Sequence, residues 1–182
     1  MIVTRHGEGY FKLQSGKTTI LIDPTDNRSM KGAAVALFTE EGGGNAGGES
    51  DGAFVIRHAG EYGVSGIHIE GWQTDPADAR AFFTVTCDGV TFGVFGDMRR
   101  EPGAELLEHV QNIDVALAPS RRETIHDVAH FLRQIEPSIV IPTHGDEGVL
   151  IKEFGGEAKK EEKLVFKKSD LEEGAMKVVC LK

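Results

Sequence analysis

The sequence predicts a layered α/β domain with mixed sheets, from two observations about where strand-like and helix-like segments fall. Up to Asp97, the apolar segments are short and rich in β-branched and aromatic residues, which is typical of strands. Beyond Asp97, such segments alternate with longer ones whose apolar residues recur at helical spacing. The chain shows no internal repeat and no second core, so we expect residues 1–182 to form a single domain.

The N-terminal segment predicts a meander of three short strands. Residues 2–5 and 10–14 are separated by the turn Gly7-Glu8-Gly9, and residues 18–22 end at Asp23-Pro24. The wholly apolar run 33–38 predicts a buried strand. The segment after it holds six glycines between positions 42 and 52. Because ordering glycine costs more entropy than ordering any other residue, we expect this glycine-rich segment to be mobile.

A β-hairpin is the strongest local signal in the first half. Residues 81–87 and 90–96 are strand-like, and the Asp88-Gly89 pair between them is typical of a tight hairpin turn. The second arm stops at Gly96-Asp97, which places one carboxylate at the end of a strand. We expect the strands up to this hairpin to form one mostly antiparallel sheet, and strands 114–119 and 138–142 to belong to the other.

The second half predicts three helices, at residues 104–110, 122–135 and 148–154, and two final strands at 164–167 and 175–181. The middle helix has the clearest pattern, because Ile125, Val128 and Leu132 share one face that can pack on a sheet. His126 and His130 have the spacing of a helical zinc motif but lie on the opposite face. We therefore interpret them as surface histidines.

Composition excludes several classes of partner. Twenty basic and 29 acidic residues give a net charge of −9, which argues against nucleic acids and anionic membranes. The longest apolar run has six residues, too few to span a membrane, and charged residues interrupt the N-terminal stretch where a signal peptide would lie. Cys87 and Cys180 lack CxxC spacing and predict buried thiols. We expect a cytoplasmic protein.

Two strands end in residues that could hold a metal ion or move a proton. Asp97 ends the second arm of the hairpin, and His144 follows the buried strand 138–142 in the sequence Thr-His-Gly-Asp. The residues alone leave two interpretations open. The two side chains either ligate a metal together or make structural hydrogen bonds at the strand ends.

The order of several short motifs resembles the metallo-β-lactamase superfamily, with the L-ascorbate-6-phosphate lactonase-like hydrolases as the most similar branch. The motifs are ILIDP at 20–24, HAGEYGVSGIHIEG at 58–71, Gly96-Asp97, and IPTHG at 141–145. The resemblance implies a four-layer αββα sandwich with mixed sheets. It also implies a site for one or two zinc ions at the rim where the two sheets meet, with Asp97 as a bridging ligand and His144 as the last ligand.

The sequence departs from that family at the first metal motif, which reads Thr-His-x-His-x-Asp-His. Thr39 matches the threonine, but the four ligand positions are occupied by Glu40, Gly42, Gly44 and Asn45. A later family histidine is also absent, because the loop after residues 67–71 reads Gln73-Thr74-Asp75. Glu40 and Asp75 could join Asp97 and His144 in a carboxylate-rich site that suits manganese or magnesium better than zinc.

Two functional hypotheses follow. The first is a degenerate, non-catalytic member of the family, a binding or assembly module that takes a small-molecule ligand or a protein partner and needs no cofactor. The second is a hydrolase that depends on zinc or manganese, uses Asp97 and His144 as catalytic residues, and acts on a small ester, lactone or phosphorylated substrate. The sequence leaves open whether the chain forms a homo-oligomer.

Overall fold

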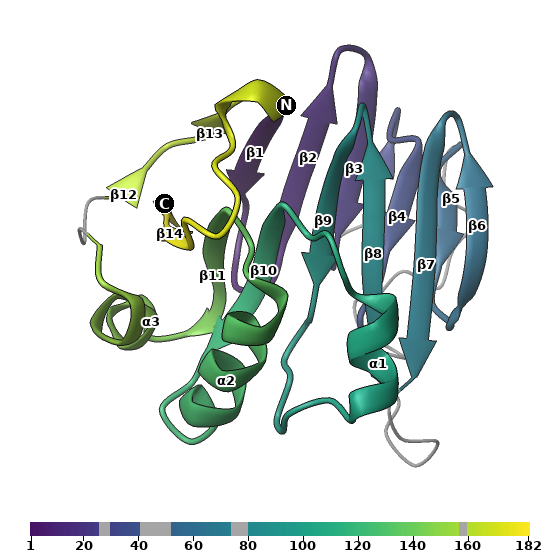
Figure 1. Ribbon diagram of the computed structural model, residues 1–182. Coiled ribbons are helices and arrows are strands. Elements are labelled where there is room, and N and C mark those ends of the chain that lie inside the picture. The colour runs from purple at the N-terminus through teal and green to yellow at the C-terminus, as the bar shows by residue number, and fades with distance from the viewer. Residues whose placement is uncertain (26–29, 41–51, 74–79, 157–159) are drawn as a thin grey trace.

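Two mixed sheets face each other in the computed structural model, which describes residues 1–25, 30–40, 52–73, 80–156 and 160–182 (Figure 1). The first sheet has the order β13-β1-β2-β3-β4-β5. Its strands are β1 (Ile2–Arg5), β2 (Phe11–Ser15), β3 (Thr18–Ile22), β4 (Val35–Leu37), β5 (Phe54–Ile56) and β13 (Leu164–Val165). The three strands of the predicted meander are antiparallel, and β3, β4 and β5 are parallel to one another.

The second sheet has the order β14-β11-β10-β9-β8-β7-β6. Its strands are β6 (Gly60–Val64), β7 (Ile67–Gln73), β8 (Ala81–Cys87), β9 (Val90–Val94), β10 (Val115–Ser120), β11 (Ile139–Gly145) and β14 (Lys177–Val178). Strands β6 to β9 are antiparallel, whereas β9, β10, β11 and β14 are parallel. A short parallel pair joins β12 (Lys160–Glu161) to β15 (Cys180–Leu181).

The predicted hairpin is present, but its predicted sheet is wrong. Cys87 pairs with Val90 across the Asp88-Gly89 turn, and the second arm then pairs with β10 rather than with the N-terminal strands. The reason is that β8 is buried on both faces: Phe83 points into the space between the sheets and Phe82 into the layer beneath the helices. A strand covered on both sides lies inside a sheet with helices on its outer face.

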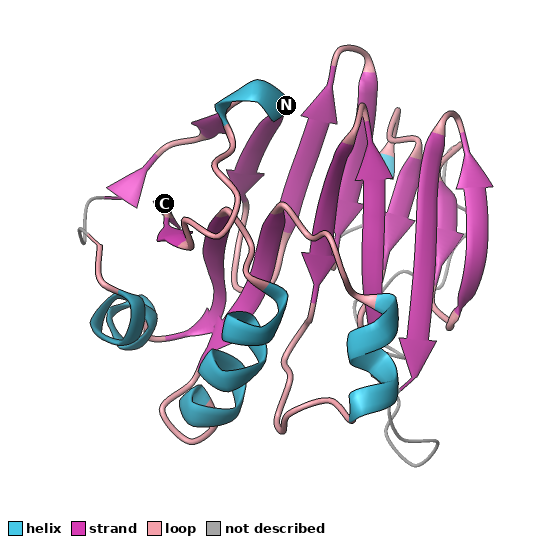
Figure 2. Cartoon of the chain, in the orientation of Figure 1, coloured by secondary structure: helices cyan, strands magenta, loops and turns pink. Residues whose placement is uncertain are grey.

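Helices cover the outer face of the second sheet (Figure 2). They are α1 (Ala104–His109), α2 (Ile125–Ile135) and α3 (Glu147–Phe154). One buried apolar cluster fills the space between the two sheets, and another joins the helices to the second sheet. This arrangement confirms the predicted fold class, an α/β sandwich of two mixed sheets.

The predicted faces of the middle helix are also confirmed, although α2 begins at Ile125 rather than at residue 122. Val128 and Leu132 are fully buried, and His126 and His130 are exposed. Phe131 extends the buried face beyond the predicted stripe. Its ring is fully buried and meets the ring of Phe95 edge-on, with 4.9 Å between centroids.

Some sequence expectations fall outside the described residues, namely the mobility of the glycine-rich segment at positions 41–51 and the position of Asp75. Cys87 and Cys180 are buried and unpaired, as predicted. None of the helices in the described ranges combines the length and the apolar character that crossing a membrane requires.

The packing of α2 leads to a test of the outer core. Replacing Phe131 by Ala removes a fully buried ring and leaves a cavity, so the free energy of unfolding should fall by about 3–5 kcal/mol. Urea denaturation measures this change. The control is His126→Ala on the exposed face of the same helix, which should change stability by no more than about 0.5 kcal/mol. Equal effects of the two substitutions would contradict this account of the packing.

Candidate functional site

The parallel strands of the second sheet bring three chemically active side chains to one edge. Strands β9, β10 and β11 run in the same direction, so their carboxyl ends lie together. Asp97 follows β9, Arg121 directly follows β10, and His144 is the next-to-last residue of β11. These side chains come from well separated parts of the sequence but meet at the same rim.

The first sheet contributes three more polar side chains to this rim. Strands β1 and β3 share one direction because each is antiparallel to β2, and β4 is parallel to β3. Glu8 lies in the turn after β1, Asp23 follows β3, and Glu40 lies beyond the end of β4. A cavity of about 260 Å³, which we call the rim pocket, lies between the two sets. Its lining is Glu8, Asp23, Pro24, Thr25, Phe38, Thr39, Glu40, Asp97, Arg121 and His144.

The Asp97 carboxylate is held by a guanidinium. Arg121 donates from Nε to Asp97 Oδ1 at 2.5 Å, and Arg99 Nη2 lies 4.0 Å from Oδ2. The side chain of Asp97 is only 10% exposed, so this ion pair supplies the positive charge that a nearly buried carboxylate needs. The same hydrogen bond raises the pKa of Arg121 above its ordinary value.

A glycine allows the end of β9 to approach the first sheet. Gly96 has a φ of +54°, and a Cβ built on it would lie 2.7 Å from Thr39 Oγ1. Any other residue would meet both a strained backbone conformation and this clash. Gly96 therefore sets the close spacing across the rim that puts Asp97 in the same pocket as Glu40.

Both ring nitrogens of His144 face the protein. Nδ1 is 3.0 Å from Thr143 Oγ1 in a hydrogen bond, and the Nε2 edge packs against Gly9, where an added Cβ would lie 2.5 Å from Nε2. Burial lowers the pKa of His144, while the nearby Asp97 and Glu8 carboxylates act in the opposite direction. The ring is therefore mostly neutral at pH 7.

The carboxylates contributed by the first sheet are also engaged. Asp23 accepts two hydrogen bonds of 2.7 Å from the backbone N–H and Oγ1 of Thr39, and Glu40 accepts one of 2.9 Å from Arg80 Nε. Glu8 Oε1 accepts from the Gly145 N–H at 3.2 Å. Burial raises the pKa of Asp23 to about 6, although its hydrogen bonds to Thr39 oppose the shift.

Three of these residues were not among the sequence-predicted site residues, namely Glu8, Asp23 and Arg121. The signal that could have found them is the one that identified Asp97, because each follows the end of a strand. Arg121 directly follows the apolar strand β10, and an arginine just after a strand is easily interpreted as a solvated surface residue. Its role depends on a contact with Asp97, 24 residues away in the sequence, that no local pattern encodes.

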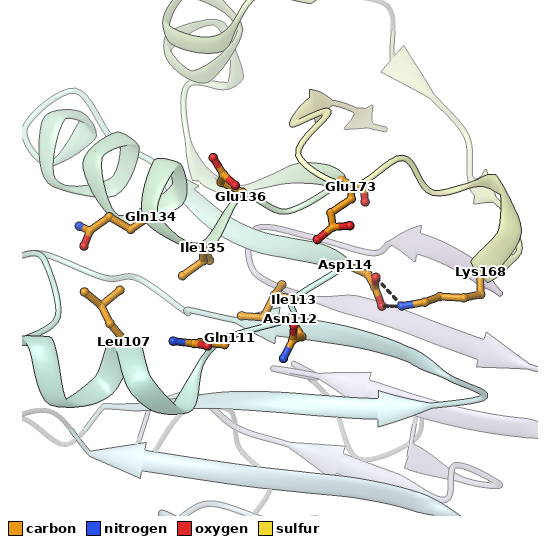
Figure 3. Close-up of a pocket in the computed structure, with 11 residues that line it drawn as sticks. Leu107, Gln111, Asn112, Ile113, Asp114, Gln134, Ile135, Glu136, Lys168 and Glu173 are labelled. Atoms are coloured by element: carbon orange, nitrogen blue, oxygen red, sulfur yellow. Dashed lines mark hydrogen bonds and ion pairs between the residues drawn. The ribbon is translucent and has the colours of Figure 1, made fainter.

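A second cavity, of about 670 Å³, lies at the opposite ends of the strands (Figure 3). Asp114 precedes β10 and Ser138 precedes β11, so this cavity borders the other edge of the second sheet. Lys168 Nζ lies 2.6 Å from both carboxylate oxygens of Asp114, which also accepts from the Thr91 N–H. The ion pair ties the C-terminal segment to the sheet, away from the rim pocket.

A family model described as the beta-lactamase superfamily domain matches residues 3–144, which include every residue that lines the rim pocket. This chain belongs to the β-lactamase superfamily. No curated protein matches it.

Solved structures share the superfamily fold. A candidate Zn-dependent hydrolase of the metallo-β-lactamase superfamily from Thermotoga maritima has a TM-score of 0.79 at 21% identity, covering 100% of this chain and 99% of that one. The metallo-β-lactamase fold protein YhfI from Bacillus subtilis has a TM-score of 0.68 at 10% identity, covering 100% and 96%. Igni18, a metallo hydrolase from Ignicoccus hospitalis, has a TM-score of 0.65 at 14% identity, and the match covers 91% of this chain and 99% of that one. At these identities the likeness shows the fold alone.

The predicted metal ligands of this superfamily member are only partly brought together. Asp97, His144 and Glu40 line the rim pocket, whereas Asp75 lies outside the described residues. A zinc site needs three or four converging protein ligands. In the part of the chain that the structure describes, no three His, Cys, Asp or Glu side chains are grouped to hold a metal ion. Since Asp97 is paired with Arg121 and Glu40 with Arg80, this arrangement does not fit zinc.

The raised pKa of Asp23 leads to a pH-dependent test. Because its pKa is about 6 in the folded protein and 3.8 ordinarily, the folded state holds more protons between these values. The contribution of Asp23 to stability therefore falls as the pH rises from about 4 to 6, by at most about 3 kcal/mol, and is constant above that range. The Asp23→Asn variant does not lose stability in this way, because asparagine does not titrate.

Chemical denaturation across the pH range measures the difference between Asp23→Asn and the unmodified protein. The advantage of the variant should grow from pH 4 to pH 6 and then level off. Taking the difference cancels the other titrating groups that the two proteins share. A difference that does not change with pH would contradict the raised pKa of Asp23.

Proposed function

We propose that this β-lactamase superfamily member is a non-catalytic binding module whose rim pocket takes a small polar molecule without a metal ion. The observation that carries the proposal is the 2.5 Å ion pair between Arg121 Nε and Asp97 Oδ1. The carboxylate that the family resemblance makes a bridging metal ligand is here bound to a fixed positive charge. In this proposal residues 1–182 act as one domain.

Electrostatics explains why this ion pair opposes metal binding. Two unit charges 4 Å apart interact by about 4 kcal/mol near a protein surface, and a divalent ion beside a guanidinium is repelled about twice as strongly. An arriving metal ion would have to displace Arg121 from Asp97. It would also need the Glu40 carboxylate to leave Arg80 and the His144 ring to turn away from Gly9.

The composition of the pocket supports a small polar ligand. Its volume of about 260 Å³ is near the lower end of small-molecule sites. The walls offer hydrogen-bond donors from Arg121, and acceptors from Glu8 and Glu40. A ligand with hydroxyl, amide or amine groups can use both kinds of partner.

The alternative is a metal-dependent hydrolase, and one observation favours it. Asp97, His144 and Glu40 line the same pocket, as the hydrolase hypothesis requires. The Thermotoga and Ignicoccus proteins are described as hydrolases that use a metal. In this alternative Arg121 leaves Asp97, Asp75 completes the ligand set, and zinc or manganese is bound. If the chain also belongs to the lactonase-like branch, its substrate would be a lactone, an ester or a phosphorylated molecule.

Metal analysis separates the two functions. Protein purified without chelator should contain far less than one equivalent of zinc or manganese. The Asp97→Ala variant should have the same metal content as the unmodified protein. Neither protein should hydrolyse nitrophenyl acetate, a simple lactone or bis(nitrophenyl) phosphate faster than buffer. One equivalent of zinc or manganese that is lost in Asp97→Ala, together with metal-dependent hydrolysis, would establish the alternative.

Binding itself is testable by NMR. When a library of small polar molecules is screened against the labelled protein, the ligands that bind should shift the backbone amides of Thr39 and Gly145, which lie at the rim. The Ser138 amide, which borders the other cavity, serves as the internal control. A screen without binding at the rim, or with shifts confined to Ser138, would contradict the binding-module proposal.

A further inference from the structure

We propose that Arg121 is a built-in cation of the rim pocket, where its guanidinium pairs with Asp97 and lies near Glu8, so that removing this group lets the pocket bind a divalent cation. The inference rests on the proposed function, because it supplies the physical reason why the pocket works without a metal. It adds that the acidic side chains around Arg121 attract a divalent cation once the guanidinium is removed.

The surroundings of the guanidinium are those of a cation between ligands. Arg121 Nε contacts Asp97 at 2.5 Å, and Nη2 lies 3.9 Å from Glu8 Oε1. His144 lines the same small pocket. These partners come from the end of β9, from the turn between β1 and β2, and from the end of β11, so both sheets face the same positive group.

The backbone at the end of β10, next to Arg121, is held close to the end of β11. Ser120 Oγ donates to the His144 carbonyl at 2.8 Å, and the Asp146 N–H donates to the Ser120 carbonyl at 3.2 Å. Gly145, with a φ of +90°, lets the ends of β10 and β11 approach, since a Cβ there would lie 2.9 Å from Ser120 O. The backbone that carries Arg121 is thus tied to the strand that carries His144.

Removing the guanidinium leaves the Asp97 and Glu8 carboxylates without this positive partner, and a divalent cation can supply that charge. Asp97 is 10% exposed and, among the described residues, would keep the Arg99 guanidinium, 4.0 Å away, as its ion-pair partner. Glu8 would lose the 3.9 Å ion pair on the same side of the pocket. A nearly buried carboxylate without its partner is strongly unfavourable, so the pocket gains affinity for a divalent cation.

The next residue in the chain provides a matched control. Arg122 carries the same charge, but its Nη2 pairs with Asp146 Oδ2 at 3.1 Å, its side chain is 77% exposed, and it does not line the rim pocket. Arg122→Ala therefore changes the net charge as much as Arg121→Ala does. The two variants differ in whether the lost guanidinium faces Asp97.

The experiment titrates Mn²⁺ into the whole chain and follows free Mn²⁺ by electron paramagnetic resonance. Arg121→Ala should bind Mn²⁺ at least about tenfold more tightly than the unmodified protein or Arg122→Ala. Mn²⁺ should raise the melting temperature of Arg121→Ala alone, because binding to the folded state stabilises it. Arg121→Lys keeps the positive charge and should bind no better than the unmodified protein. Adding Asp97→Ala to Arg121→Ala should abolish the gain.

The outcomes separate this inference from the proposed function. Stoichiometric Mn²⁺ binding by the unmodified protein would overturn both. No gain in folded Arg121→Ala, or an equal gain in Arg122→Ala, would overturn the built-in cation alone. If Arg121→Ala does not fold, Arg121→Gln answers the same question, because glutamine is neutral and can still donate a hydrogen bond to Asp97.

Discussion

The rim of this protein depends on the ion pair between Arg121 and Asp97. Asp97 lies almost buried beyond the end of β9, in a position where an ionised carboxylate needs a partner. The partner comes from the neighbouring parallel strand, whose last residue is followed at once by Arg121. This one contact gives the Asp97 carboxylate a cationic partner, and in our proposal it decides which further ions or molecules the pocket accepts.

The fold makes that contact by placing the ends of parallel strands beside one another. Strands β9, β10 and β11 deliver Asp97, Arg121 and His144 to one edge, and the first sheet delivers Glu8, Asp23 and Glu40 from the facing side. Glycines without side chains permit the close approach: Gly9 against the His144 ring, Gly96 against Thr39, and Gly145 against Ser120. In our proposal this rim holds the Arg121 guanidinium where the family resemblance implies a metal ion.

Much of the architecture could be predicted from local sequence patterns. The Asp88-Gly89 turn predicted its hairpin, and the apolar spacing of Val128 and Leu132 predicted the buried face of α2. Local patterns failed where distant segments decide the outcome. The hairpin belongs to the second sheet because β9 pairs with β10, and pairing between segments separated by a loop and a helix leaves no short-range signal.

The same limit applies to the site. Asp97, His144 and Glu40 were predicted from strand ends and from family resemblance, and the structure places all three around one pocket. The partners of these residues could not be predicted, because an arginine after a strand has the same local pattern whether it is solvated or bound to a carboxylate. Asp75 was predicted from its place in a loop and lies outside the described residues.

The most direct test of the central claim is a crystal structure of the protein grown with excess zinc and manganese, with anomalous scattering recorded for both metals. Our account predicts no anomalous peak in the rim pocket and a direct hydrogen bond from Arg121 to Asp97. A metal ion bound between Asp97 and His144, with the Arg121 guanidinium displaced from the pocket, would contradict it.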